Sequence, residues 1–216
     1  PLMCKPFNVI FEAPELLINL GMILSGLNLG KSMTVLDFGA GTCWISRFLN
    51  QLECITISCD VSETALNIGR RLFEESSILR EYVLPPKFLH FDGHRIDLPE
   101  KSVDRIICYD AFHHISNQKE ILEEFHRVLR DGGIAGFSEP GRHHSKDPKS
   151  QYEMENFRVL ENDIDIAEID RMATEVGFTH LILKVSGEMD MTAAELRSLN
   201  SVTRSKEKKL ITKGIR

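Results

Sequence analysis

The stretch VLDFGAGTCW (residues 35–44) decides how the rest of the chain is interpreted. An apolar run ends near an acid, Asp37, and two glycines, Gly39 and Gly41, follow one residue apart. A strand, a tight glycine turn and a helix N-terminus together form a place where a ligand can contact bare main chain. The stretch therefore predicts a ligand-binding turn between a strand and a helix.

Outside this turn, apolar runs alternate with helical patterns, which indicates βαβ repetition. We expect strands at 33–38, 54–60, 87–93, 103–110, 134–140 and 179–187. We expect helices at 14–30, 43–52, 62–76, 117–133, 165–178 and 192–200, the fourth of these ended by Gly132 or Gly133. The basic tail from 203 to 216 is left without an assignment. The predicted class is α/β, doubly wound, with helices on both faces of a mostly parallel central sheet.

The composition is that of a soluble globular domain. The chain has 216 residues, 42% of them hydrophobic and 27% charged, with a formal net charge of -6. This length suits one α/β domain. The negative charge disfavours binding to nucleic acid through overall electrostatics. No apolar run approaches the roughly 20 residues that span a bilayer, so no membrane span is expected.

The cysteines indicate a reducing compartment. There are five, an odd number, and no C-x-x-C pair occurs. Cys54, Cys59 and Cys108 fall within apolar runs, so we expect reduced core thiols rather than disulfides or zinc ligands. The N-terminus lacks the charged start and apolar core of a secretory signal. The predicted location is cytoplasmic.

Two ligand chemistries use such a glycine turn. A dinucleotide site has the pattern G-x-G-x-x-G, and here the third glycine position is Trp44. An indole there should obstruct close helix–strand packing, and Asp37 would repel a pyrophosphate. A ligand that carries a cationic amino acid and no phosphate meets neither difficulty.

The turn resembles the first motif of the class I S-adenosylmethionine (SAM)-dependent methyltransferases, hydrophobic–hydrophobic–acid–x–Gly–x–Gly–x–Gly. Cys43 stands where the family has its last glycine, which leaves the backbone geometry there open. Three later segments agree with the family in order, namely ISCDVS, FDGHRIDLPEKSVDRIICYDAFHHI and VLRDGGIAGFSEPG. The resemblance runs from about residue 35 to 140 and implies SAM as the cofactor.

The resemblance also implies a set of cofactor-binding residues. Asp60, at the end of the second strand, should receive the two ribose hydroxyls. Asp92 should lie near the adenine amino group, with the main chain of Gly93 on a ring nitrogen. The full expected set is Asp37, Gly39, Ala40, Gly41, Asp60, Val61, Asp92, Gly93, Tyr109 and Asp110.

Methyl transfer to an oxygen requires a group that accepts the proton. The place for this base is the carboxyl edge of the fourth and fifth strands, where the chain has YDAFHHI and SEPGRHH. His113 and His114 are the candidate bases because an unperturbed imidazole titrates near pH 6.5. Glu139 could orient a histidine or the substrate. The alternative is that one of the two histidines only packs or caps.

Two acids raise the alternative of a metal-dependent methyltransferase. Asp110 and Glu139 end neighbouring strands, and some O-methyltransferases hold Mg²⁺ at such positions to acidify a diol. Two carboxylates alone are thin support, and no Cys/His spacing indicates zinc. The sequence prediction is therefore a site without a metal.

The segment from about 140 to 163 is too long for a simple connection and lies where the family recognises its acceptor. Its polar side chains suit a polyhydroxylated acceptor, unless it is only a solvated loop; they are Arg142, His143, His144, Tyr152, Glu153 and Glu155. It also resembles methyltransferase modules that accompany glycosyltransferases in surface-glycan synthesis. This resemblance implies O-methylation of a sugar or glycan, with glycosyltransferase domains as partners.

The predicted organisation is one SAM-dependent methyltransferase domain over 1–216, with a helical lead-in over about 1–33. The abrupt ends are consistent with one module of a longer protein. The alternatives are a methyltransferase for an amine, a quinone or a small natural product, and a SAM-binding module without catalysis. A nicotinamide dehydrogenase is disfavoured by Trp44 and Asp37.

Overall fold

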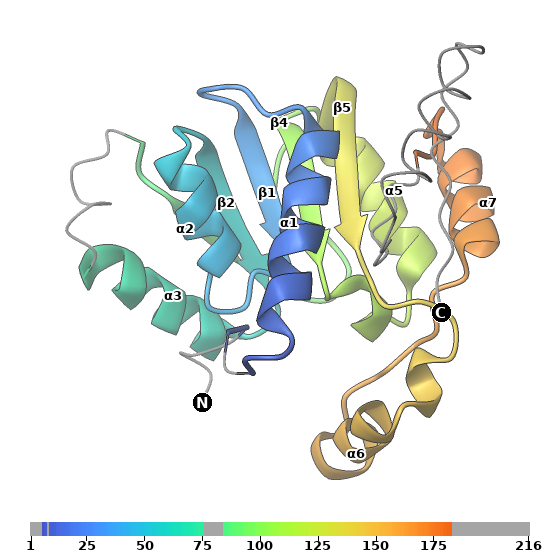
Figure 1. The fold of residues 1–216 in the computed structure, drawn as a ribbon. Coiled ribbons are helices and arrows are strands. Elements are labelled where there is room, and N and C mark those ends of the chain that lie inside the picture. Colours follow the sequence, from blue (N-terminus) through green and yellow to red (C-terminus); the bar gives the residue numbers. More distant parts are fainter. Residues whose placement is uncertain (1–5, 8, 76–83, 183–216) are drawn as a thin grey trace, which may run out of the picture.

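The computed structural model describes residues 6–7, 9–75 and 84–182. Its centre is a five-stranded sheet in the order β3-β2-β1-β4-β5, with every neighbouring pair parallel. The strands are β1 (Thr34–Phe38), β2 (Ile55–Asp60), β3 (Lys87–His90), β4 (Val103–Tyr109) and β5 (Leu129–Ser138). The prediction of a doubly wound α/β fold is confirmed (Figure 1).

Helices cover both faces of this sheet. The α-helices are α1 (Ala13–Leu27), α2 (Trp44–Gln51), α3 (Glu63–Glu75), α5 (Gln118–Val128), α6 (Pro148–Phe157) and α7 (Ile166–Val176). Short 3₁₀ turns, η2 (Phe112–His114) and η3 (His144–Lys146), follow β4 and β5. Each predicted helix within the described ranges is present, with ends that differ by a few residues.

The two faces have separate hydrophobic cores because strand side chains alternate. Leu36 of β1 packs with α5 and α7, whereas its neighbour Val35 packs with α1 and α2. Ile106 and Ile107 of β4 divide in the same way. Strands buried on both faces read as continuous apolar runs, and this is why the sequence located β1, β2 and β4 to within one residue.

The end of α5 was predicted wrongly. The helix ends at Val128, and Gly132 and Gly133 lie inside β5 instead of ending the helix. The register of β5 shifts there, because Leu129 pairs with Val103 while Ile134 pairs with Arg105. Gly132 has φ +76°, which the loop-out of this bulge requires. The glycine pair therefore serves the bulge.

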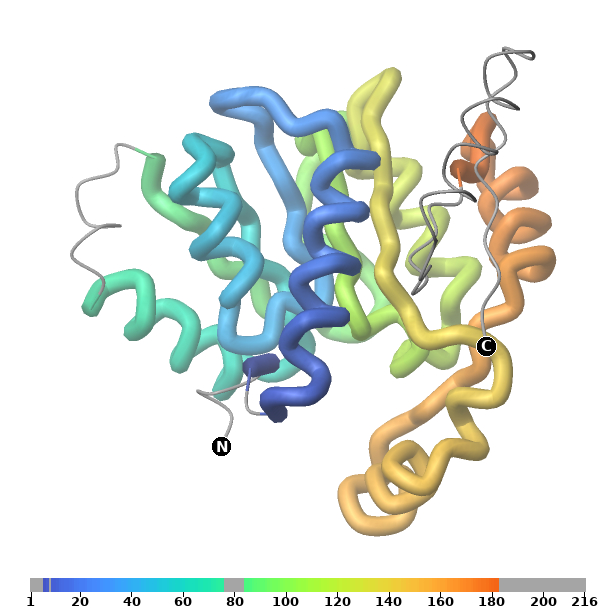
Figure 2. Tube along the Cα trace, in the orientation of Figure 1, coloured from blue at the N-terminus to red at the C-terminus, as the bar shows by residue number. Residues whose placement is uncertain are grey.

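The segment after β5 is not a simple loop. It contains η3 and the ten-residue helix α6, whose N-cap Asp147 accepts a hydrogen bond from the Lys149 amide. Figure 2 shows α6 standing off the sheet, on the side where the strands have their carboxyl ends. Residues 179–182 form no strand, and the rest of the strand predicted at 179–187 lies outside the described residues. The predicted helix at 192–200 and the basic tail lie outside them too.

The thiol environment agrees with the sequence prediction. Cys43, Cys54, Cys59 and Cys108 are free and buried. Burial raises the pKa of each of these thiols. No helix within the described ranges is long and apolar enough to cross a membrane.

Candidate functional site

The glycine turn joins β1 to α2 and requires its first glycine. Gly39 has φ +74°, and a Cβ there would lie 2.3 Å from the Cβ of Ala111, just beyond β4. The amides of Gly39 and Ala40 both donate to the Cys59 carbonyl, at 2.9 and 3.0 Å. Gly41 has φ +52°, but the space around it is open. The turn is therefore fixed against its neighbouring strands and uncovered at Gly41.

Cys43 keeps the conformation expected of a third glycine. Its φ is +62°, in the left-handed region, although it is a buried non-glycine residue. Such a conformation costs roughly 1–2 kcal/mol for a residue with a side chain. Trp44, at the first position of α2, packs edge-to-face on Tyr109, with ring centroids 5.6 Å apart. The indole belongs to the core that includes α1.

Asp60 lies across the turn from the end of β2. Its Oδ2 accepts a hydrogen bond from the Gly41 amide at 2.7 Å, and its Oδ1 accepts one from the Ser62 amide at 2.7 Å. The carboxylate at the end of β2 therefore holds the glycine turn that follows β1. Val61, which follows, is 61% exposed. This geometry brings Gly41, Asp60 and Val61 together at an accessible edge.

Asp37 is buried beneath the turn. Its Oδ2 accepts hydrogen bonds from the Ser46 amide at 3.0 Å and the Ser46 hydroxyl at 2.6 Å, and Ser58 donates to that hydroxyl at 2.7 Å. Burial raises the pKa of Asp37 to about 7, against the effect of the Ser46 hydrogen bonds. Its carboxyl group secures the first turn of α2 through Ser46.

Asp92 and Gly93 form an exposed turn after β3. The Asp92 Oδ1 accepts hydrogen bonds from the amides of His94 and Arg95, and these bonds lower its pKa. Gly93 has φ +97°, and its carbonyl accepts a hydrogen bond from Asn117 at 3.1 Å. This turn follows β3, which pairs with β2, so it lies on the Asp60 side of the sheet edge.

Tyr109 and Asp110, at the end of β4, face different surroundings. The Tyr109 hydroxyl donates to the Leu16 carbonyl of α1 at 2.9 Å, and burial raises its pKa to about 12. Asp110 is exposed, has φ +53°, and donates its amide to the Ser138 carbonyl at 2.7 Å. Asp110 is therefore at the accessible edge, whereas the Tyr109 hydroxyl is engaged inside the fold.

Glu139 anchors the turn that carries the two histidines. Its carboxylate accepts hydrogen bonds from the amides of Ala111, Phe112 and His113, at 3.1, 2.9 and 3.2 Å. It also contacts His113 Nδ1 at 2.6 Å. The side chain is 5% exposed, so these partners occupy it fully. Glu139 thus fixes the position of His113.

His113 and His114 differ sharply in access. The side chain of His113 is 3% exposed, and that of His114 is 37% exposed. Burial alone would lower the pKa of His113, but the hydrogen bond and charge of Glu139, with the charges of Asp110 and Glu161, raise it above the ordinary value. The ring centroids of His113 and His114 are 3.9 Å apart. Of these two histidines, only His114 presents its imidazole to solvent.

Glu161, which was not predicted from the sequence, lies beside His113, His114 and His144. Its side chain is 2% exposed and contacts His144 Nε2 at 2.7 Å and His113 Nε2 at 3.5 Å. No spacing or periodicity distinguishes Glu161 from the other acids of its segment. His144, predicted only as an acceptor contact, joins the cluster, whereas Arg142 pairs with Asp165 at 2.7 Å.

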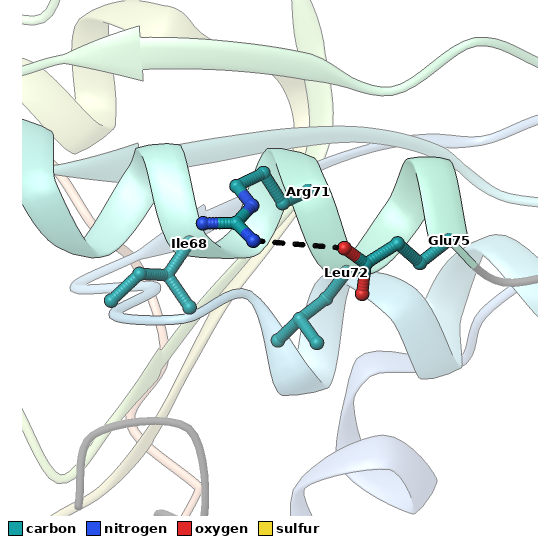
Figure 3. A pocket seen from close by; sticks show the side chains of 4 residues that line it. All are labelled: Ile68, Arg71, Leu72 and Glu75. Carbon is teal, nitrogen blue, oxygen red and sulfur yellow. Dashed lines mark ion pairs between the residues drawn. The ribbon is translucent and has the colours of Figure 1, made fainter.

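A surface hollow on α3 lies apart from these groups. Figure 3 shows its lining of Ile68, Arg71, Leu72 and Glu75, with the Arg71–Glu75 ion pair at 3.8 Å. It encloses about 30 Å³ and includes none of the predicted site residues. A nucleoside does not fit there.

The comparisons with known proteins agree with this geometry. Residues 36–137 match the sequence model of the family described as "Methyltransferase domain". Residues 36–137 therefore resemble a methyltransferase domain. The matched segment begins in β1 and ends in β5, so it spans the glycine turn, Asp60 and the two histidines.

Individual relatives extend this picture. The chain is 26% identical over 129 residues to the ubiquinone/menaquinone biosynthesis C-methyltransferase UbiE of Coxiella burnetii, covering 58% of this chain and 50% of that protein. It is 30% identical over 109 residues to the sarcosine/dimethylglycine N-methyltransferase of Aphanothece halophytica, and the match covers 49% of this chain and 37% of that protein. The chain spans about half the length, or less, of these relatives.

The fold agrees with that of a solved structure. A SAM-dependent methyltransferase from Aquifex aeolicus superposes with a TM-score of 0.62 at 20% identity, covering 81% of this chain and 86% of that one. The sheet and its helices therefore share the Rossmann-like fold of that enzyme.

Proposed function

We propose that the protein transfers the methyl group of SAM to a hydroxyl oxygen of a small polar acceptor, with a sugar as the favoured class. The observation that carries this proposal is the position of His114. It is the partly exposed imidazole on the turn after β4, and Ala111 of the same turn packs on Gly39. The proton-accepting group and the cofactor turn thus share one edge of the sheet.

The reaction is an in-line displacement at carbon. The acceptor oxygen forms a bond to the methyl carbon while the carbon–sulfur bond breaks, and the sulfur keeps the electron pair to give S-adenosylhomocysteine. The hydroxyl proton passes to a base. Holding the two reactants in line accounts for about 7–11 kcal/mol of barrier reduction in well-oriented systems. A base within hydrogen-bond reach adds about 10²–10⁴-fold.

The two histidines take different parts in this proposal. His114 accepts the proton because its side chain reaches the exterior. His113 is a positioning residue, because its ring is buried and its Nδ1 is held by Glu139 at 2.6 Å. Glu139 in turn fixes the amides of the whole turn.

The acceptor class is argued from this chain's own residues. The two relatives are named for methylation at carbon and at nitrogen, so they favour no one acceptor for this chain. The segment after β5 carries exposed hydrogen-bonding side chains on η3 and α6. Such groups match the hydroxyls of a sugar better than an apolar ring. A small natural product or an amine is the alternative acceptor.

The test is methyl transfer from isotopically labelled SAM onto a panel of glycosides, with sarcosine and a quinol as the amine and carbon acceptors. Mass spectrometry identifies the methylated atom, and S-adenosylhomocysteine release gives the rate. A labelled sugar methyl ether is the expected product. Labelling of only the amine or the quinol contradicts the hydroxyl acceptor, and tight cofactor binding with no product from any acceptor contradicts catalysis.

A further inference from the structure

Three imidazoles surround one buried carboxylate beyond the ends of β4 and β5. Glu161 Oε2 lies 2.7 Å from His144 Nε2 and 3.5 Å from His113 Nε2. Its other oxygen, Oε1, lies 3.5 Å from His114 Nδ1. One carboxylate from the segment after α6 is thus aimed between the two histidines of η2.

The pairing of Glu161 is incomplete. Within the described residues, Oε1 is buried and accepts no hydrogen bond. No lysine or arginine side chain of those residues lies within ion-pair distance of Glu161 or Glu139. A buried carboxylate oxygen without a partner is costly, and a bound cation removes that cost.

The orientation of His113 supplies a second, independent argument. Its Nδ1 is 2.6 Å from Glu139 Oε2, so the proton of a neutral ring lies on Nδ1. In the neutral ring the lone pair of Nε2 faces Glu161 Oε2 at 3.5 Å, so two acceptors face each other until a proton or a metal ion lies between them. A carboxylate that receives Nδ1–H while Nε2 binds an ion is the usual support of a metal-ligating histidine.

We propose that His113, His114 and Glu161 form a binding site for a divalent transition metal, with Zn²⁺ as the reference ion. Each offers one ligand atom, and these atoms lie within 4.8 Å of one another. Two imidazoles and a carboxylate are a ligand set that suits zinc, whereas Mg²⁺ prefers oxygen ligands alone. His114 exchanges the hydrogen bond to the Leu160 carbonyl, now 2.6 Å, for coordination.

The site links two segments that are distant in sequence. Glu161 follows α6, whereas His113 and His114 follow β4, so an ion there would fix the segment after β5 against the turn that follows β4. One consequence rests on the proposed function. Coordination uses the lone pairs of both imidazoles, so His114 would accept the proton only in the metal-free protein, and in the metal-bound protein the ion would acidify the acceptor hydroxyl instead.

The experiment is a titration of the whole chain, first dialysed against EDTA, with ZnCl₂ in a calorimeter. We expect one saturable site. Glu161→Gln should weaken zinc binding by at least about 100-fold, because removal even of an outer-shell partner costs 10–100-fold. Substitution by Co²⁺ should give visible absorption of a nitrogen- and oxygen-ligated ion in the wild type and lose it in His113→Ala.

The matched control is Glu120→Gln. Glu120 forms a His–Glu pair with His94 at 3.2 Å on the surface, outside this cluster, so its variant should bind zinc as the wild type does. Far-ultraviolet circular dichroism and S-adenosylhomocysteine binding report whether each variant is folded. Equal zinc affinity in the wild type and a folded Glu161→Gln variant overturns the proposal, as does the absence of a saturable site.

The proposed function has a separate readout. Zinc binding with no methyl transfer would leave the metal site in place and contradict the enzyme proposal. Methyl transfer that persists in EDTA, with no zinc site in the titration, would leave the enzyme proposal in place and contradict the metal site.

Discussion

Asp60 Oδ2 accepts a hydrogen bond from the Gly41 amide at 2.7 Å, so the acid at the end of β2 closes the glycine turn at the end of β1. The same carboxylate accepts the Ser62 amide with its other oxygen. The glycine turn and the connection from β2 to α3 therefore share one carboxyl group at the edge of the sheet. A nucleoside that binds over this turn meets both the carboxylate and main chain.

Asp60→Ala should weaken S-adenosylhomocysteine binding by about 5–150-fold, because hydrogen bonds to a charged group are worth roughly 1–3 kcal/mol. Isothermal titration calorimetry measures the loss. Asp131→Asn is the control, since the Asp131 side chain is 86% exposed and pairs only with Lys101 among the contacts found. An affinity within twofold of the wild type would remove Asp60 from the cofactor site.

Gly39→Ala and Gly41→Ala should separate folding from binding. The first places a Cβ 2.3 Å from that of Ala111 and should prevent stable folding. The second meets open space and should cost only about 1–2 kcal/mol of backbone strain. We expect Gly41→Ala to fold, by thermal denaturation, but to lose cofactor affinity because its methyl group lies over the turn. Unaltered affinity in that variant would argue against a ligand there.

Cys43 and Gly69 should be coupled. A Cβ at Gly69 would lie 2.4 Å from Cys43 Sγ and 2.9 Å from its Cβ. Gly69→Ala should therefore destabilise the protein by about 1–3 kcal/mol, the usual range for overpacking. In a Cys43→Gly background most of this loss should disappear, leaving the contact with the Thr42 carbonyl at 3.1 Å. Urea denaturation of the four proteins measures the coupling, and additive losses would contradict it.

Because of Asp37, the stability of the folded protein should fall as the pH rises. Its folded pKa of about 7 lies above the unfolded value of 3.8, so between these values the folded state holds a proton that the unfolded state has lost. The free energy of unfolding should drop by up to about 4 kcal/mol from pH 4 to 7 and then level off. Asp37→Asn should flatten this slope in denaturant titrations. An unchanged pH dependence of the free energy of unfolding in a folded Asp37→Asn variant would contradict the raised pKa.

His114→Ala should lower the turnover number at saturating SAM by about 10²–10⁴-fold, whichever way the imidazole acts on the acceptor proton. Its cofactor affinity should stay near that of the wild type. His126→Ala is the control, because that ring, in the last turn of α5, packs on Phe178 away from the glycine turn. A loss below tenfold would exclude His114 from the chemistry.

The sheet and the glycine turn could be predicted because their signals are local. Buried parallel strands are short apolar runs, and the turn combines an acid with closely spaced glycines. The end of α5 could not, because the glycine pair that usually stops a helix here serves a bulge in β5. Nor could Glu161, whose importance comes only from its position beside His113 and His144 in three dimensions.

The edge-to-face contacts of Trp44 with Phe7 and Tyr109 have a practical consequence. The centroids are 5.2 and 5.6 Å apart, and Trp44 is the only tryptophan of the chain. Its indole lies between Phe7 of the N-terminal lead-in and Tyr109 at the end of β4, and Trp44 directly follows Cys43 of the glycine turn. Intrinsic fluorescence therefore provides a built-in optical probe, whose emission would register both undocking of the lead-in and ligand-driven shifts of the glycine turn.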